Sequence, residues 1–192
     1  MAGSVRTPIV SLLGLVFALS ELGLTLFKRA KKGQARSADR GSLWLLWGIV
    51  VVSVNLAYAL GARKPEFGFG PAPAAVAAGV ALFVGGLALR WYSIMYLGRY
   101  FTVNVAIATD HRVIDTGPYR YIRHPSYTGA LMAFVGLGLA LRNWAALAVM
   151  VVPIALVFLW RIRVEEAALA QALGDTYRDY MSRTKRLVPA IY

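Results

Sequence analysis

The sequence predicts an all-α integral membrane protein with five transmembrane helices, for three reasons. The chain of 192 residues is 58% hydrophobic and 16% charged, with a mean hydropathy of +0.57, whereas a soluble domain of this size would carry more charge. Its apolar runs approach the length of about 20 residues that a helix needs to cross a bilayer. Its basic residues gather in the links between these runs, as the positive-inside rule describes. We therefore expect a single membrane domain over residues 1–192.

Five apolar runs are expected to cross the membrane. The second begins with Trp44 and Trp47, as is typical of an aromatic belt at the interface. The third is long and ends in an amphipathic, aromatic stretch that includes Arg90, which we expect to snorkel to the interface. Only Arg142 and Asn143 separate the fourth and fifth, which indicates a tight helical hairpin. The predicted spans are residues 8–27, 42–61, 72–98, 127–141 and 144–160.

The fourth predicted span carries small residues along its length. Small side chains allow transmembrane helices to approach closely. We therefore expect this helix to pack tightly against a neighbour through Gly129, Ala133, Gly136, Gly138 and Ala140.

The distribution of basic residues predicts the topology. The link 28–40 holds six basic residues and one acid, which places it in the cytoplasm. The N-terminus and the link 61–71 then lie outside, and the C-terminus and a catalytic region at about 99–192 lie at the cytoplasmic face. The compact length suggests the plasma membrane of a prokaryote. The net charge of +12 then favours contact with anionic membrane lipids rather than nucleic acid.

Glu21 lies inside the first predicted span. A carboxylate within a span is costly and is by default a candidate for function. We favour the simpler interpretation, in which Glu21 lies near the interface or pairs with a basic residue on a neighbouring helix.

The densest cluster of polar, aromatic and turn residues is 117–129. Pro125 follows His124 and suits the first turn of a helix. The N-terminus of such a helix would attract a carboxylate or a ribose hydroxyl, and Tyr119 and Tyr127 could stack on an aromatic ring or face a cation. An ordinary Arg/Tyr anchor at the membrane surface remains an equal alternative.

A second polar cluster closes the last apolar run. Arg161 and Glu165 are four residues apart and share a helical face. They form either an intrahelical ion pair or a site in which each binds a different ligand group. The helix is expected to continue to a C-cap at Gly174, and a short amphipathic helix should follow over 175–183.

Several site classes are not supported by the sequence. There are no cysteines, which excludes disulfides, thiolate metal sites and a cysteine nucleophile. His111 and His124 are the only histidines, and no His/Asp/Glu spacing matches a metal site. No Ser/His/Asp grouping stands out.

The motif Gly-Pro-Tyr-Arg-Tyr-Ile-Arg-His-Pro-Ser-Tyr-Thr-Gly at 117–129 resembles the isoprenylcysteine carboxyl methyltransferase family and its phospholipid methyltransferase relatives. The resemblance extends from His111 through the hairpin to 161–166 and 174–180, roughly the C-terminal half of the chain. Members of this family lie within the membrane and use S-adenosylmethionine without a Rossmann domain. This agrees with the absence of a Gly-rich loop after a strand here.

The resemblance implies a cytoplasmic pocket, formed by the loop before the fourth span and by the C-terminal tail. This pocket would bind S-adenosylmethionine and its product S-adenosylhomocysteine, and a lipophilic acceptor would enter sideways from the bilayer. Arg161 and Glu165 are the implied catalytic residues: Arg161 faces the acceptor carboxylate and Glu165 also holds the cofactor. The other implied cofactor-binding residues are His111, Arg112, Val113, Ile114, Tyr119, His124, Pro125, Ser126 and Tyr127.

The resemblance leaves alternatives open. The expected reaction is methyl ester formation on the α-carboxylate of a prenylated cysteine, which is anionic at neutral pH and needs no base. N- or O-methylation of a phospholipid or another small lipid is the first alternative; an amine would need a base, for which Glu165 or Glu166 would be candidates. The second is an NADPH-dependent reductase of the sterol reductase type, although Ser126 stands where those enzymes carry Asn. A non-catalytic protein that binds a lipid or a partner is the third.

Overall fold

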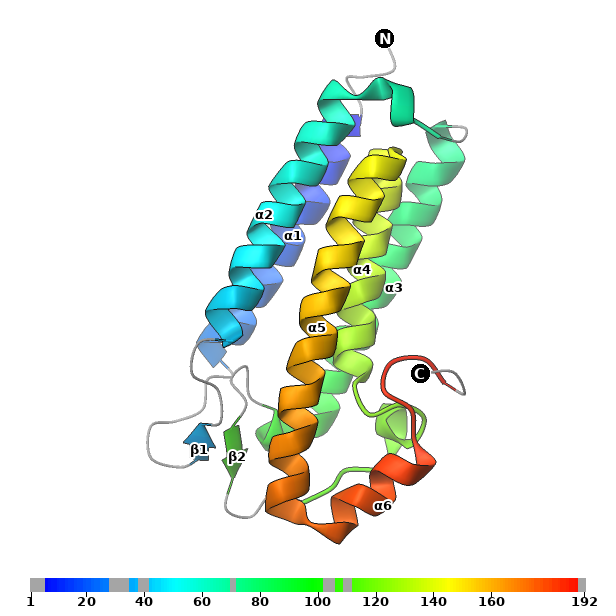
Figure 1. Ribbon diagram of the computed structural model, residues 1–192. Coiled ribbons are helices and arrows are strands. Elements are labelled where there is room, and N and C mark those ends of the chain that lie inside the picture. The colour runs from blue at the N-terminus through cyan, green and yellow to red at the C-terminus, as the bar shows by residue number, and fades with distance from the viewer. Residues whose placement is uncertain are drawn as a thin grey trace.

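Five long helices form a bundle, and a sixth, short helix lies across one end of it (Figure 1). The computed structural model describes residues 6–27, 35–37, 42–69, 72–101, 106–108 and 112–189. The helices are α1 (Arg6–Phe27), α2 (Ser42–Arg63), α3 (Ala72–Leu97), α4 (Pro125–Leu141), α5 (Trp144–Leu173) and α6 (Asp175–Arg183). Short 3₁₀ turns lie at Pro65–Phe67, Gly98–Tyr100 and Gly117–Arg120.

The all-α expectation is confirmed for the bundle, and a small two-stranded antiparallel sheet is added to it. It pairs β1 (Ala35–Ser37) with β2 (Ala106–Ala108). The two strands come from links that were expected to be without regular structure, and they lie near the end of the bundle that carries α6 (Figure 1). The sequence gives little sign of this pairing, because a three-residue strand shows almost no periodicity.

Within the part of the chain that the structure describes, four helices are long and apolar enough to cross a membrane: Pro8–Phe27, Leu43–Arg63, Pro73–Tyr100 and Trp144–Leu173. The helix Pro125–Leu141 is apolar but has only 17 residues, about 26 Å at the usual rise of 1.5 Å per residue. Four of the five predicted spans are therefore confirmed by length and composition. The last predicted span is the first part of α5, which continues as expected to Leu173.

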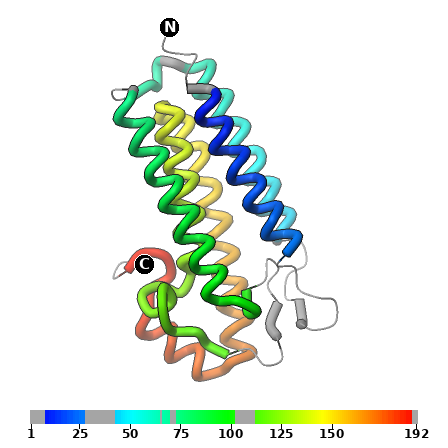
Figure 2. The backbone as a smooth tube through the Cα atoms, turned by 180° about the vertical axis from the view of Figure 1, so that it is seen from behind, coloured from blue at the N-terminus to red at the C-terminus, as the bar shows by residue number. Residues whose placement is uncertain are grey.

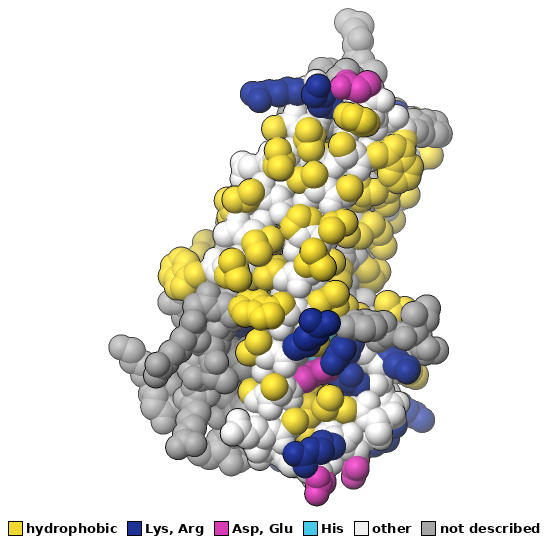
Figure 3. Space-filling view, in the orientation of Figure 1, with side chains coloured by type: hydrophobic (Ala, Val, Ile, Leu, Met, Phe, Trp, Pro, Cys, Tyr) yellow, Lys and Arg dark blue, Asp and Glu magenta, His cyan; other side chains and the backbone are white. Residues whose placement is uncertain are grey.

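The outer surface of the bundle agrees with a membrane environment. Hydrophobic side chains cover the visible face along the helices, whereas Lys, Arg, Asp and Glu gather toward the two ends (Figure 3). Large apolar residues on α1 and α2 are exposed, including Leu26 at 69% and Trp44 at 81%. In water such surfaces would be unfavourable, whereas in a bilayer they face lipid.

Glycines bring α3 and α4 into direct backbone contact. A Cβ atom added to Gly86 would lie 2.5 Å from the carbonyl oxygen of Gly129, and one added to Gly136 would lie 2.5 Å from that of Gly79. Such distances leave no room for a side chain. The predicted close packing of the fourth span is confirmed, and its partner is α3.

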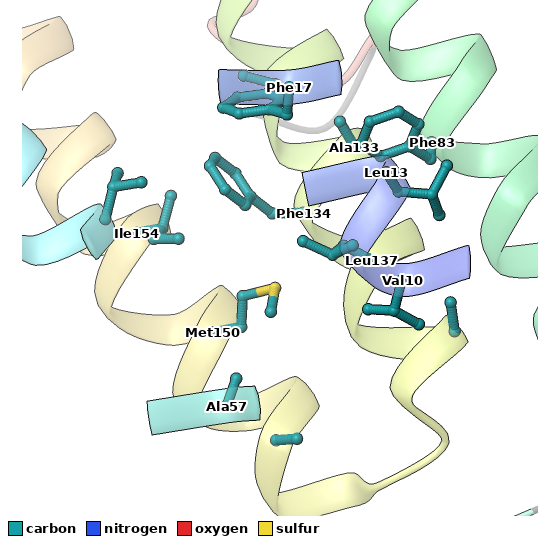
Figure 4. Close-up of a cluster of buried hydrophobic side chains, with 14 of the residues drawn as sticks. Val10, Leu13, Phe17, Ala57, Phe83, Ala133, Phe134, Leu137, Met150 and Ile154 are labelled. Carbon is teal, nitrogen blue, oxygen red and sulfur yellow. The ribbon is translucent and has the colours of Figure 1, made fainter. Parts of the chain in front are cut away.

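A hydrophobic core joins α1 and α2 to the other helices. Phe17 on α1 and Phe134 on α4 face each other, with ring centroids 4.7 Å apart (Figure 4). Met150 and Ile154 of α5 lie in the same cluster and are fully buried (Figure 4). Seen from behind, α1 and α2 run along the same side of the bundle (Figure 2), where α1 packs mainly on α4 and α2 mainly on α5.

The predicted hairpin between α4 and α5 is confirmed. Arg142 adopts a left-handed conformation (φ 54°) and ends α4. The side chain of Asn143 accepts a hydrogen bond from the Ala146 backbone N–H (2.9 Å), which caps α5, and donates to the Lys64 carbonyl (2.7 Å). The hairpin is thereby tied to the end of α2.

Candidate functional site

One cavity reaches from the α6 end of the bundle into the space between α1, α2, α4 and α5. One part is polar and aromatic, and its lining includes Arg112, Tyr119, His124, Arg161, Glu165 and Tyr177. The other part is apolar, and its lining includes Phe17, Leu46, Trp47, Val50, Phe134 and Phe158. A ligand with a polar head and a hydrocarbon tail would match both parts.

The turn before α4 forms one wall of the polar part. Gly117 has a φ of 57°, and the ring of Tyr96 lies so close that a Cβ at this position would clash with it. Tyr119 donates to the carbonyl of Ser93 (3.1 Å), and its own carbonyl accepts from the hydroxyl of Tyr180 (2.7 Å). The turn is thus fixed between α3 and α6.

The three buried tyrosines of this region are hydrogen-bonding groups rather than bases. Burial raises the pKa of the Tyr119 phenol, and it does the same for Tyr177 and Tyr180. They therefore stay neutral at physiological pH and can donate hydrogen bonds.

The predicted start of α4 is confirmed. His124 is the N-cap and Pro125 stands in the first turn, two residues before the span predicted at 127. His124 and Ser126 line the cavity. Pro125 is fully buried between these two lining residues, and its place in the cofactor pocket stays a prediction. The ring shapes the turn, because Pro lacks the N–H that a helix N-terminus leaves unsatisfied.

Arg161, Tyr127 and Glu165 form a hydrogen-bonded chain. Arg161 donates from Nε to the hydroxyl oxygen of Tyr127 (3.1 Å), and this hydroxyl donates to Glu165 Oε2 (3.2 Å). The first contact joins α4 to α5. Its arginine is buried, because Arg161 is only 3% exposed. Tyr127 therefore links the two residues that the sequence selected as catalytic.

Glu166 is a buried carboxylate that contacts several basic side chains. Its sequence position suggests it only as a possible base. Its Oε1 accepts from Arg123 Nε (2.8 Å) and lies 3.2 Å from His124 Nε2, and its Oε2 accepts from Arg186 (2.9 Å). The residue is 3% exposed. It holds the ring of His124 in place at the edge of the cavity.

The C-terminal residues 184–187 run alongside the motif and are here called the C-terminal strap. The backbone N–H groups of Arg123 and His124 donate to the carbonyls of Lys185 (2.7 Å) and Arg186 (3.0 Å). Thr128 donates to the Leu187 carbonyl (2.7 Å), and Arg123 also donates to the carbonyl of Thr184. The expectation that the C-terminal tail and the loop before α4 fold together is confirmed. The predicted C-cap at Gly174 and the short helix α6 are confirmed too.

A buried ion pair lies deeper in the cavity. Arg90 donates from Nε and Nη2 to the two carboxylate oxygens of Glu21, at 2.6 and 2.8 Å. The expectation that Arg90 snorkels to the interface is wrong, because a carboxylate on the neighbouring helix offers it a bidentate, charge-assisted contact. The expectation that Glu21 pairs with a basic residue is confirmed.

Most of the residues selected from the sequence lie together. The residues that line the cavity are Arg112, Val113, Ile114, Tyr119, His124, Ser126, Tyr127, Arg161 and Glu165. His111 and most of the basic link 28–40 lie outside the described residues. The lining residues that sequence reasoning missed include Glu21, Arg90, Arg123, Tyr177 and Tyr180. A charged residue within an apolar run was the available signal for Glu21 and Arg90.

Positive charge dominates the cavity lining. Among the described residues, four arginines line it (Arg90, Arg112, Arg123 and Arg161), against two glutamates (Glu21 and Glu165). Even when Glu166, which binds Arg123, is added to the acids, the positive residues remain in excess. Such a lining suits an anionic group better than a cationic one.

Comparison with known proteins agrees with the sequence motif. The model of the isoprenylcysteine carboxyl methyltransferase family matches residues 79–171. Protein-S-isoprenylcysteine O-methyltransferase B of Arabidopsis thaliana is 33% identical over 115 residues, which are 59% of this chain and 58% of that protein. The corresponding enzyme of Schizosaccharomyces pombe is 32% identical over 108 residues, 55% of this chain and 46% of that protein.

A solved structure shares the fold. The eukaryotic intramembrane Ras methyltransferase, an isoprenylcysteine carboxyl methyltransferase, superposes with a TM-score of 0.64 at 24% identity, covering 73% of this chain and 52% of that chain. The chain spans about half the length of the curated relatives it matches. The resemblance to this family is confirmed, and the chain is an integral membrane protein.

Proposed function

We propose that this chain transfers the methyl group of S-adenosylmethionine to the α-carboxylate of a prenylated cysteine or a similar lipophilic acid. The observation that carries the proposal is the cavity, in which an arginine-rich polar part continues into an apolar part between helices. Such a cavity would bind the carboxylate and the hydrocarbon tail of an acceptor at the same time. Relatives that match this chain are named for the same reaction.

The polar part fits S-adenosylmethionine by its chemistry. Tyr119, Tyr177 and Tyr180 offer aromatic faces to a purine. Arg112 would bind the carboxylate of the methionine portion, and Glu165 would bind its ammonium or a ribose hydroxyl. Val113, Ile114, His124, Ser126 and Tyr127 would complete the wall. His111 is proposed for the same pocket from the sequence resemblance alone.

Arg161 would hold the acceptor carboxylate. S-adenosylmethionine supplies a methyl group that is already activated by a sulfonium, so the chain's residues have mainly to align an in-line attack. With the cofactor bound, the carboxylate held by Arg161 would attack the methyl carbon, so that the O–CH₃ bond would form as the S–CH₃ bond broke, and the products would be the methyl ester and S-adenosylhomocysteine. The carboxylate is ionised at neutral pH, so no base is needed.

The amine alternative fits the geometry less well. An amine acceptor has to lose a proton to a base. Glu166 lies among Arg123, His124 and Arg186, and Glu165 already accepts a hydrogen bond from Tyr127. A carboxylate surrounded by cations is a weak base. The charge of the cavity therefore favours carboxyl methylation over N-methylation of a phospholipid.

We further propose that the whole chain forms one membrane domain in which α4 makes a fifth crossing between α3 and α5. The N-terminus would then lie outside, and the cofactor pocket would open to the cytoplasm of a prokaryote. Two features support this: α4 packs along α3 through glycines, and described basic residues of the turn before α4 and of α6, such as Arg120 and Arg183, lie at the α6 end.

Calorimetric titration of the detergent-purified protein with S-adenosylhomocysteine tests the cofactor site. We expect micromolar binding that is lost in Glu165→Ala and in His124→Ala. Glu66→Ala is the matched control, because Glu66 is an exposed glutamate in a surface pair with Lys64 outside this cavity. A folded wild-type protein that does not bind S-adenosylhomocysteine would contradict the proposal.

A further inference from the structure

Two polar contacts join α1 to α3, and the residues that form them are adjacent in the sequence of each helix. Trp91 Nε1 donates to Ser20 Oγ (2.7 Å), and Arg90 donates to both carboxylate oxygens of Glu21. Only the second involves charge. Helix α1 lies outside the segment 79–171 that matches the family model.

Arg90 also contacts the first turn of α4. Its Nη1 donates to the carbonyl oxygen of Ser126 (3.2 Å) and to its hydroxyl (3.1 Å). All three guanidinium nitrogens of Arg90 therefore form hydrogen bonds, Nε and Nη2 with Glu21 and Nη1 with Ser126. The guanidinium connects α1 to the turn that precedes Tyr127.

Arg90 and Glu21 line the same cavity as Arg161. Their side chains are only 13% and 9% exposed. A buried ion pair adds little net stability, so its clearest effect here is on the charge of the cavity. Without Glu21, Arg90 would offer an acceptor carboxylate a second cation beside the one that Arg161 provides.

Resting on the proposed function, we propose that Glu21 is a positioning residue that neutralises Arg90 and so directs the acceptor carboxylate to Arg161. Glu21 does not touch the reacting atoms in this account. It prevents an unproductive binding mode in which the carboxylate pairs with Arg90, away from the methyl group.

The test uses Glu21→Gln, which keeps an acceptor for Arg90 but removes the negative charge. The acid N-acetyl-S-farnesylcysteine and its uncharged primary amide are titrated into the purified protein in the presence of S-adenosylhomocysteine. We expect the acid to bind about tenfold more tightly to the variant, the scale of one charge-assisted hydrogen bond, and the amide to bind as it does to the wild type. In turnover, KM for the acid and kcat should both fall.

Ser20→Ala is the matched control, because it breaks the neighbouring contact between α1 and α3 without changing charge. A purely structural role for Glu21 would alter the binding of acid and amide by the same factor, as loosening of α1 would, and that result would overturn the proposal. Unchanged binding of the acid would overturn it as well.

The double variant Glu21→Gln/Arg90→Gln removes both charges and keeps the inference testable if the single variant does not fold. It should bind acid and amide with the wild-type preference and, where Glu21→Gln folds, have a higher kcat than that single variant. A double variant that still binds the acid more tightly than the wild type would contradict the role assigned to Arg90. Wild-type protein that binds the acid but does not methylate it would instead count against the proposed function.

Discussion

The helix pair α1–α2 and the region α3–α6 differ in how they are held together. In the second region, α3 and α4 meet through backbone contacts at glycines, and the motif before α4 is fixed by hydrogen bonds to α6 and the C-terminal strap. In the first, α1 packs mainly on α4 and α2 mainly on α5, and the Tyr58 hydroxyl of α2 donates to the Val10 carbonyl of α1 (2.6 Å). The family model matches only within the second region.

This difference separates two tasks. The region α3–α6 supplies the turn that we propose for the cofactor, together with Arg161 and Glu165, whose proposed roles require fixed positions. The pair α1–α2 supplies much of the apolar wall, through residues such as Phe17, Trp47 and Val50. We infer that the chemistry belongs to the second region and the choice of acceptor tail to the first. Four substitutions test this division.

Arg161→Ala should have the largest effect. Loss of the cation that holds the acceptor carboxylate is expected to lower kcat/KM for a farnesylated acid by at least about 100-fold, as expected when a charged group is removed from a buried site. Binding of S-adenosylhomocysteine should change little. Arg163→Ala, on the exposed side of α5, is the control, and an equal loss there would contradict the assignment.

Gly86→Ala should loosen the contact between α3 and α4. The new methyl group would lie 2.5 Å from the Gly129 carbonyl oxygen, and overpacking of this kind costs about 2 kcal/mol of unfolding free energy. Thermal unfolding in detergent measures the change. The adjacent Gly85 has no atom within 4 Å of its added Cβ, so Gly85→Ala should unfold at the wild-type temperature. Equal shifts in the two variants would show that the glycine contact is unimportant.

Trp47→Ala should affect the acceptor and leave the cofactor alone. Removing an indole from the apolar wall is expected to raise KM for a farnesylated acid about tenfold, the scale of burying a large side chain. Titration with S-adenosylhomocysteine should be unchanged. Trp44, also on α2, is 81% exposed, so Trp44→Ala serves as the control. A loss of cofactor binding in Trp47→Ala would break the proposed division of tasks.

Tyr127→Phe should have the smallest effect. It removes the hydroxyl that joins Arg161 to Glu165 and leaves the ring in place. A net loss of about 1 kcal/mol corresponds to an approximately fivefold lower kcat. Steady-state kinetics beside Tyr121→Phe, whose side chain is 63% exposed, isolates the hydroxyl. Wild-type kcat in Tyr127→Phe would show that the link has no catalytic role.

The sequence predicts local features of this fold well. Apolar length locates the helices, the His124–Pro125 step marks the start of α4, and Gly174 marks the end of α5. These features depend on the conformational preferences of neighbouring residues. The spacing of Arg161 and Glu165 likewise places both on one face of a helix.

Contacts between distant segments could not be predicted in the same way. Arg90 pairs with Glu21, which lies 69 residues earlier, and Glu166 binds Arg123 and Arg186 from two other segments. Each pairing depends on which helices become neighbours and how they are rotated, and neither is visible in local periodicity. The charged residues were visible within the sequence, but their partners were not.

The proposed reaction is the transfer of a methyl group to the carboxylate of an acceptor bound in the cavity. The most direct measurement supplies S-adenosylmethionine with a tritiated methyl group and N-acetyl-S-farnesylcysteine to the purified protein, then treats the lipid product with base. A methyl ester releases its label as volatile methanol, whereas an N-methylated product keeps it. We predict base-labile label that is lost in Arg161→Ala. Base-stable label, or no transfer by a protein that binds S-adenosylhomocysteine, would contradict the account.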